Sequence, residues 1–382
     1  MMLHFRDPAK LKTKKIVFEE AYAARDSTTL EQLKELSSKR RMIEESINES
    51  SSITTAIARE MSGGLTSRSE QVLHNLDMYL PLLENLIFHV GMISNFSQIV
   101  RWNSELKMQW TSALSSSSFF NFKGPKYFQI NSLQFEIGMT LFLYGAILRE
   151  RALEFLCAVV DLVQSATLFR EAAGVFHHLA HKVLPILQYS LTAERPPEVV
   201  SSVSTVMSLI CLAEAQAVTI KRAEEKGTTV GLLAKLHHGV AELLDEAAGV
   251  LNTASRECND ISSRIVEFIS CCKALHELKS LKYFAESLKI ANQFGAAIGV
   301  LRVALVDVKK KKMPGQESWK CVLKEEIDKF AELLRKHEHE NEFVWHEKVP
   351  SEDELPKPEG NKIASIIPYQ PKRWERQLAF KI

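Results

Sequence analysis

Two histidine pairs are the residues of this chain whose spacing comes nearest to a metal site. His177 and His181 are four residues apart in the sequence HHLAH, which places both imidazoles on one face of a helix. A zinc protease would need a glutamate between them and a third ligand, but leucine and alanine fill that interval. His337 and His339 are two residues apart and would point in different directions from a helix. We expect surface or core histidines at the first pair, a solvated helix face at the second, and no metal.

No other pattern typical of catalysis or cofactor binding stands out. Gly63-Gly64 lacks both the strand and the lysine of a phosphate-binding loop, and no GxSxG elbow or catalytic pair of carboxylates is evident. The six cysteines include no CxxC pair and lie mostly among apolar residues, as free thiols in a reducing compartment do. We expect a protein that is not an enzyme, with no catalytic residue, no cofactor and no small-molecule substrate.

Two surface features allow both a structural and a functional interpretation. Lys309, Lys310, Lys311 and Lys312 form a run that ends a predicted helix, where cations complement the helix dipole. The same run could contact acidic lipid head groups. Phe119, Phe120 and Phe122 follow a run of serines, and they form either a local core under a loop or an exposed apolar patch for a partner.

The overall charge and hydropathy favour a cytoplasmic protein that interacts through local surfaces. The formal net charge is +1, with 48 Lys and Arg against 47 Asp and Glu, so no global field indicates nucleic acid as a partner. The N-terminus has no signal-peptide core, Met2 excludes N-myristoylation, and no prenylation box follows the last cysteine. No run of about 18 apolar residues indicates a membrane span.

The hydrophobic pattern is helical along almost the whole chain. In residues 230–251, apolar side chains recur at spacings of three and four, which makes one stripe on a helix. Similar amphipathic segments without a competing strand pattern predict an all-α fold, an elongated and curved layer of long helices joined by short connections. The expected segments are 28–49, 68–93, 131–164, 165–191, 198–226, 261–275, 276–308 and 318–339.

Loops are predicted at 50–67 and 115–125, which are rich in serine and glycine. From Val349 onward the chain has the proline density of an extended segment, yet it keeps large apolar residues such as Ile367, Tyr369 and Trp374. A disordered tail rarely holds so many, so we expect this segment to pack along the helical body.

Several segments in the same order resemble the Bro domain of endosomal-sorting proteins. They are LKMQWTSAL at 106–114 with Trp110, SLQFEIGMTLFLYGAILRERA at 132–152, the stretch from GVFHHLAHKVLP to PPEVVSSVSTVMSLICLAEAQAVTIKRAEEKG, then LLAKLHHGVAELLDEA, and ENEFVWHEKVPSEDELP at 340–356. The resemblance covers about residues 100 to 367. It implies a boomerang-like helical-repeat domain with a few short N-terminal strands, expected as one domain over 1–367 with a packed extension at 368–382.

The resemblance also implies a partner and a site. Bro domains bind the C-terminal amphipathic helix of an ESCRT-III filament subunit and are recruited peripherally to endosomes. The family's apolar patch falls on Leu232 and Leu236, and a third position that is aromatic in a family member falls on Thr219. Leu236 also belongs to the inward stripe of its helix, and Lys221 and Lys235 could pair with acidic partner residues. The open alternative is a helical scaffold that keeps this fold but binds another protein or an acidic membrane. The coiled arm and proline-rich tail of longer members are not in this sequence.

Overall fold

The computed structural model describes residues 3–48, 67–93, 97–116, 125–158, 161–188, 194–310 and 314–381. Most of the predicted loop at 50–67, the phenylalanines 119, 120 and 122, and Lys311 and Lys312 lie outside these ranges.

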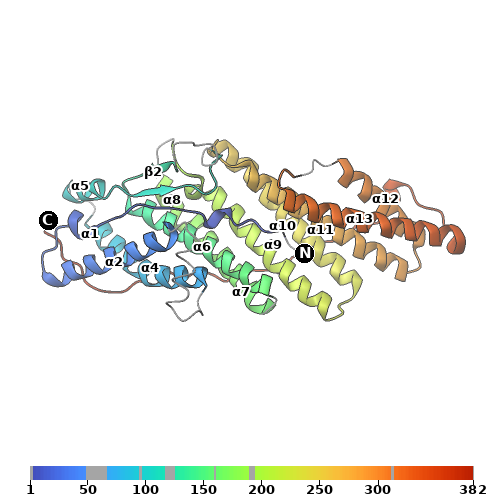
Figure 1. Ribbon diagram of the computed structural model, residues 1–382, viewed down its shortest axis with the longest axis horizontal. Helices are drawn as coiled ribbons and strands as arrows, with labels where there is room; N and C mark the ends of the chain where they lie inside the picture. The colour runs from blue at the N-terminus through green and yellow to red at the C-terminus, as the bar shows by residue number, and fades with distance from the viewer. Residues whose placement is uncertain are drawn as a thin grey trace.

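Long helices lie side by side in chain order and make an elongated molecule (Figure 1). Each packs mainly against the one before and the one after it, as in a helical-repeat layer. The long helices are α2 (Ser27–Asn48), α4 (Arg68–Met92), α6 (Leu133–Ala158), α7 (Leu162–His178), α9 (Ser201–Glu225), α10 (Val230–Glu257), α11 (Ser263–Ile290), α12 (Phe294–Lys310) and α13 (Glu317–Glu340).

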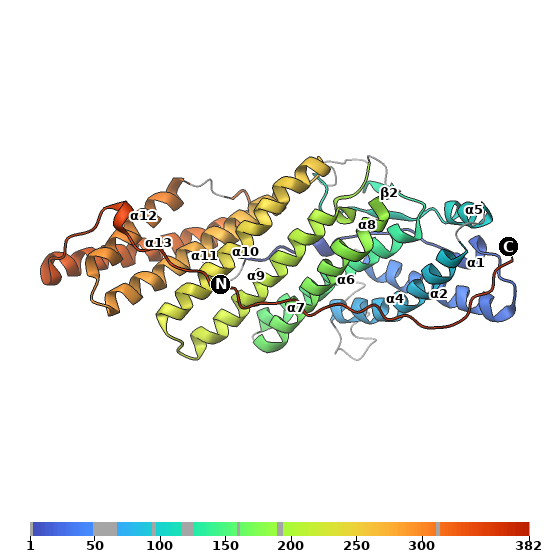
Figure 2. The same cartoon turned by 180° about the vertical axis from the view of Figure 1, so that it is seen from behind.

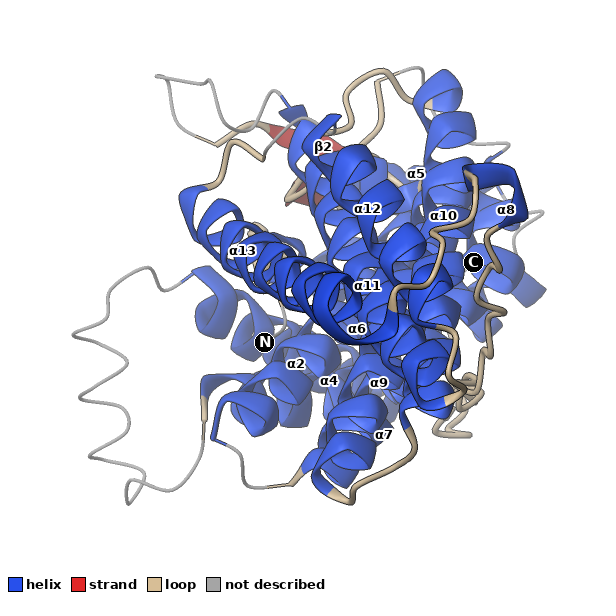
Figure 3. Cartoon of the chain, turned by 90° about the vertical axis from the view of Figure 1, so that its right-hand side faces the viewer, coloured by secondary structure: helices blue, strands red, loops and turns tan. Residues whose placement is uncertain are grey.

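Shorter elements join these helices. A small antiparallel sheet pairs β1 (Gln109–Thr111) with β2 (Tyr127–Gln129), and Figure 3 shows it at the side of the helical body. The other short elements are η1 (Asp7–Ala9), α1 (Phe18–Ala21), α5 (Ser97–Glu105), the π-helical η3 (Leu179–Val183), α8 (Leu184–Leu187), η5 (Pro197–Val199), the π-helical η6 (Asn341–Trp345) and η7 (Glu352–Glu354). The predicted all-helical fold with a few short strands is confirmed.

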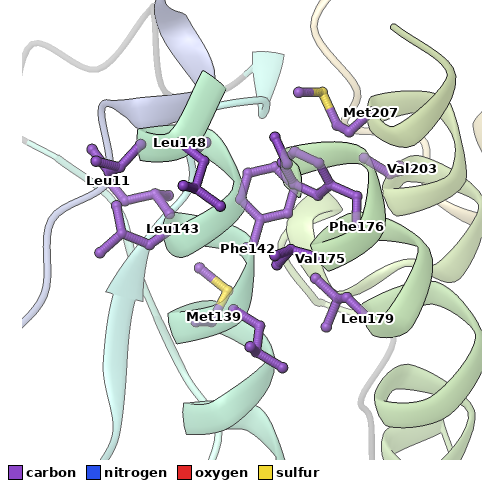
Figure 4. Close-up of a cluster of buried hydrophobic side chains, with 14 of the residues drawn as sticks. Leu11, Met139, Phe142, Leu143, Leu148, Val175, Phe176, Leu179, Val203 and Met207 are labelled. Carbon is purple, nitrogen blue, oxygen red and sulfur yellow. The ribbon is translucent and has the colours of Figure 1, made fainter. Parts of the chain in front are cut away.

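The core between α6, α7 and α9 shows why these helices pack closely (Figure 4). The rings of Phe142 and Phe176 meet edge to face, with 5.2 Å between their centroids. Gly145 makes room for this contact, because a Cβ there would lie 2.9 Å from the Phe176 ring. Both side chains are fully buried, and burying a Phe contributes about 1.5–3 kcal/mol to stability.

One predicted helix boundary is wrong. The sequence analysis separated 261–275 from 276–308, whereas α11 runs unbroken from Ser263 to Ile290 and α12 starts at Phe294. The break lies at Asn292, whose φ of 58° is left-handed. Asparagine tolerates this conformation better than most residues, so the signal was an asparagine rather than a proline or glycine.

Two other expectations need correction. His337 is buried rather than solvated, and its Nδ1 lies 2.9 Å from the carbonyl oxygen of Leu333. Helix α9 is long and apolar enough to cross a membrane by length and composition, although no such run was expected. Of its most apolar stretch, 78% is buried inside the protein, which is typical of the core helix of a helical layer.

The last part of the chain, residues 349–381, is an extended segment that we call the strap. Figure 2 shows it crossing the face of the molecule from α12 past α10, α9, α7 and α4 to α2. Hydrogen bonds hold its backbone at two points along this path. On α10 the carbonyl oxygen of Lys235 accepts a hydrogen bond from Asn361 N at 3.0 Å, and on α4 Pro81 O accepts one from Trp374 N at 3.3 Å. At the far end, Ala24 and Phe380 form an antiparallel bridge.

Glycines on three helices let the strap approach the helix backbones. A Cβ at Gly174 in α7 would lie 1.8 Å from Ile367 O, and one at Gly239 in α10 would lie 2.3 Å from Asn361 O. At Gly299 in α12 a Cβ would lie 2.5 Å from the Leu355 side chain. A side chain larger than hydrogen at any of these positions would displace the strap or its contacts.

Candidate functional site

Three of the predicted partner-binding residues are exposed on the face that the strap crosses. Leu232 is 42% exposed, and Thr219 and Lys235 are also exposed. Leu236 is only 4% exposed and belongs to the core, so it supports the surface from beneath rather than contacting a partner. Lys221 follows Thr219 by two positions, about 200° around α9, and faces away from this surface.

Hydrogen bonds fix which residues of neighbouring helices lie at the same height. The Gln216 Nε2 in α9 donates to Leu236 O in α10 at 2.8 Å. Since α9 and α10 run antiparallel, one turn beyond Gln216 corresponds to one turn before Leu236, which aligns Thr219 with Leu232. On the other side of α9, Ser208 Oγ donates to Ala173 O in α7 at 2.8 Å.

The second register adds a residue that the sequence analysis missed. Counting along antiparallel α7 and α9 from the Ala173–Ser208 contact brings Val163 level with Thr219. Val163 is 48% exposed and lies on the same side of α7 as Gly174, where the strap passes. We call the row formed by Val163, Thr219 and Leu232 the shelf. The spacing of apolar residues along α7 indicates which side of that helix is buried. Which residues of α7, α9 and α10 lie level with one another cannot be read from the sequence.

The strap forms one edge of the shelf. Gln216 is fully buried and uses its whole side-chain amide: Nε2 donates to Leu236 O and to Asn361 O at 2.9 Å, while Oε1 accepts from Ile363 N at 2.9 Å. Ile363 itself is 47% exposed, so it adds a third large apolar side chain beside those of Val163 and Leu232. Lys235 pairs with Glu359 of the strap at 3.4 Å, a solvent-exposed contact of little energy.

A buried histidine pair supports the end of the α9–α10 hairpin. His237 Nδ1 and His276 Nδ1 are 3.0 Å apart, and His237 Nε2 is 3.5 Å from Glu224 Oε1. Burial lowers the pKa of both histidines. Burial opposes ionisation of Glu224, but hydrogen bonds from His237 and Tyr283 outweigh it and lower its pKa to about 2. A neutral His237 that donates from Nε2 to this carboxylate must accept at Nδ1, so His276 is the donor.

The remaining predicted residues that the structure describes do not join this site. Lys309 and Lys310 are exposed at the end of α12, and Lys310 pairs with Asp307 at 3.2 Å. The rings of His177 and His181 are tilted against each other, with 4.2 Å between their centroids. Within the ranges that the structure describes, no group of three or more His, Cys, Asp or Glu residues is arranged to hold a metal ion.

Comparison with known proteins identifies the family. A family model described as the BRO1-like domain matches residues 26–380. The chain belongs to the BRO1-like domain family. The resemblance inferred from the ordered segments is thereby confirmed, and the match extends further toward the N-terminus than those segments did.

Curated BRO1 relatives are similar at low identity. ALG-2 interacting protein X of Dictyostelium discoideum is 25% identical over 315 residues, which cover 81% of this chain and 36% of that protein. The palA/RIM20 pH-response regulator of Saccharomyces cerevisiae is 24% identical over 251 residues, 65% of this chain and 34% of that protein. Human BROX is 26% identical over 194 residues, covering 47% of this chain and 46% of BROX. The chain therefore spans about a third of the length of most of these relatives.

Solved BRO1 structures show the same fold. A structure of the ALIX BRO1 CHMP4C complex aligns with a TM-score of 0.69 at 20% identity and covers 94% of both chains. A structure reported as the basis for endosomal targeting by the Bro1 domain aligns with a TM-score of 0.65 at 16% identity, covering 94% of this chain and 91% of that one.

Proposed function

We propose that this BRO1 domain is an adaptor of endosomal sorting that binds the C-terminal amphipathic helix of an ESCRT-III filament subunit on the shelf. The observation that carries the proposal is the row of Val163, Thr219 and Leu232, in which two large apolar side chains are 48% and 42% exposed on adjacent parts of three packed helices. Family membership and the existence of an ALIX BRO1 complex with CHMP4C support the same kind of partner.

The geometry favours a helix as the bound element. The shelf runs across α7, α9 and α10, so it offers apolar side chains at intervals from one helix to the next. The strap crosses the same three helices (Figure 2) and forms one edge of the shelf. A helix that presents apolar residues at i, i+3 and i+4 places them along one line, and a few anchors supply most of the affinity. Lys235 beside the shelf suits an acidic residue on the partner.

Thr219 weakens this site relative to one with an aromatic residue. Its hydroxyl bonds back to Ala215 O at 2.9 Å, so it presents a small methyl group rather than a ring. An aromatic anchor buried on binding would contribute about 1–2 kcal/mol more. We therefore propose a partner affinity below that of domains with an aromatic anchor.

Recruitment and role follow from the same interaction. We propose a non-catalytic scaffold on the cytoplasmic side of endosomes, brought there by its ESCRT-III partner. Contact of the lysines at 309–312 with an acidic membrane remains a secondary prediction. We also propose that 1–367 fold as a single domain with residues 368–382 as its extension.

Titration of a labelled C-terminal peptide from an ESCRT-III filament subunit tests the proposal. Leu232→Asp puts a charge at the α10 end of the row and should weaken binding at least about tenfold, since the carboxylate would lose water without a partner. Val100→Asp is the matched control, because Val100 is 64% exposed on α5, which lies far from α10 in Figure 1, and its replacement should leave affinity unchanged. Equal affinity of wild type and Leu232→Asp would overturn the assignment of the shelf.

A further inference from the structure

Apart from the shelf, the structure has a groove where the strap passes from α12 to α10. It has a volume of about 810 Å³. The strap touches α12 where Leu355 packs at Gly299, and it next contacts α10 where Asn361 N donates to Lys235 O. Between these two points it passes over α11, and the space beneath is the groove.

The floor of this groove is apolar and built from two helices. On α11 it consists of Ala274, Leu278 and Leu281, which follow the three- and four-residue spacing of one helix face. On α12 the same spacing places Val300, Val303, Ala304 and Val308 along the groove. Leu281 and Val303 are the partly exposed residues of this floor, and the others are buried beneath them. Two parallel ridges of this kind form a trough into which the ridge of a third helix fits.

The rim of the groove is acidic. Glu277 and Asp307 stand on the two helices, and Glu352 and Asp353 stand on the strap, against Lys357 as the one lysine among the lining residues. Lys273 and Lys310 contact the two helix carboxylates from outside, at 3.8 Å and 3.2 Å. The two strap carboxylates, Glu352 and Asp353, are exposed and line the open side of the groove with negative charge.

We propose that this groove binds a cationic amphipathic helix, with its apolar side chains on the α11–α12 floor and its lysines or arginines at the Glu352–Asp353 rim. The charge of the rim favours a basic peptide over a membrane surface as the occupant. The two exposed strap carboxylates, Glu352 and Asp353, repel the phosphate groups of a membrane surface, whereas they attract a basic peptide and speed its association. Pro356 and Pro358 restrict the backbone of the strap where it lines the groove, which favours an extended wall without helix or sheet bonds.

The groove is separate from the shelf, and its partner is of the opposite charge. Lys235 at the shelf suits an acidic helix, while the Glu352–Asp353 rim excludes one. The domain would then bind two helical segments at once, one on either side of the strap's contact with α10. The proposal does not depend on the identity of the partner on the shelf.

The probe for this site is a fluorescein-labelled helical peptide of leucine and lysine, about 18 residues long so that it forms a helix. Its control is the same peptide with glutamate in place of lysine. We expect anisotropy titration to show binding of the lysine peptide and at least about tenfold weaker binding of the glutamate peptide. Equal binding of the two peptides would overturn the proposal.

Variants locate the binding. Ala304→Trp fills the floor, and the double change Glu352→Lys and Asp353→Lys reverses the rim on an exposed segment that does not carry the core; each should weaken the lysine peptide at least about tenfold. The matched control, Glu31→Lys with Glu45→Lys on the distant helix α2, and the shelf variant Leu232→Asp should both bind like wild type. Loss of binding in either of these two, or full binding by the reversed rim, would overturn the assignment.

Discussion

Gln216 shows how one buried side chain can hold the strap in place. Its amide group bonds to two backbone carbonyls and to Ile363 N, and at 3.3 Å to Ala364 N as well. In the sequence, Gln216 is a polar residue among apolar helical positions with no evident partner. Its role is visible only when a segment almost 150 positions later returns to the same helix. The resemblance to the Bro domain predicted a helix here but implied no role for Gln216.

We expect Gln216→Leu to loosen the strap. Four hydrogen bonds would be lost, and buried carbonyl and amide groups would remain without partners, at about 1–3 kcal/mol for each unsatisfied group. Hydrogen exchange at Asn361, Ile363 and Ala364 should become faster than in wild type. Urea unfolding should show a lower free energy of unfolding. Unchanged exchange at these amides would mean that Gln216 does not hold the strap.

The His237–His276 pair makes stability depend on pH. Both pKa values are lowered in the folded protein, chiefly by burial, and Lys279 nearby also opposes protonation. Below the ordinary histidine pKa of about 6.5, the unfolded chain therefore binds more protons than the folded one. The stabilisation is complete above that pH and is lost as the pH falls further. Glu224, with a pKa of about 2, stays ionised throughout this window.

We expect the free energy of unfolding to be lower at pH 5.5 than at pH 7.5, by up to about 1.4 kcal/mol per pKa unit for each histidine. The double variant His237→Gln with His276→Leu should lose the part of this difference that the pair carries. His4, His177 and His178, whose pKa values are also lowered chiefly by burial, should keep their own part. His181→Gln should keep the wild-type difference, because His181 is exposed. Urea unfolding at both pH values measures it. A double variant with the wild-type pH dependence would show that other groups carry the effect.

At the scale of elements, the sequence predicted most helices and missed what aligns them. Apolar spacing was enough for α10 and α13, whose stripes are clean. It failed between α11 and α12, because a single left-handed Asn292 ends one helix without a proline or glycine. The shelf depends on the register of three antiparallel helices, and the hydrogen bonds that fix it join residues far apart in the chain. Leu232 was therefore predicted from the resemblance, whereas Val163 was found only in the structure.

Glycines along the strap's path give a direct test at this scale. Gly174→Ala would place a Cβ 1.8 Å from Ile367 O, so the strap must move away from α7 and the protein should lose stability. Gly249→Ala is the matched change, since it lies in α10 with nothing within 4 Å of the added carbon. It should stabilise the protein by up to about 1 kcal/mol, as alanine is the better helix former. Thermal unfolding of both variants measures this, and a shift in the same direction would contradict the close contact.

At the scale of the whole molecule, the chain is a layer of helices held together lengthwise by an extended segment (Figure 2). The sequence indicated both parts, because the helical pattern continues along almost the whole chain and the apolar residues of the last segment need a surface to cover. It could not indicate where the strap lies. That position decides the edge of the shelf and creates the acidic groove beside it.

One peptide titration tests the central claim most directly. A labelled C-terminal helix of an ESCRT-III filament subunit would be titrated against wild type, Leu232→Asp and Thr219→Phe, each first checked for cooperative unfolding. We expect Thr219→Phe to bind about 5–30 times more tightly than wild type, which corresponds to about 1–2 kcal/mol from a buried ring, and Leu232→Asp to bind most weakly. Three superimposed binding curves would contradict the claim that the shelf binds this helix.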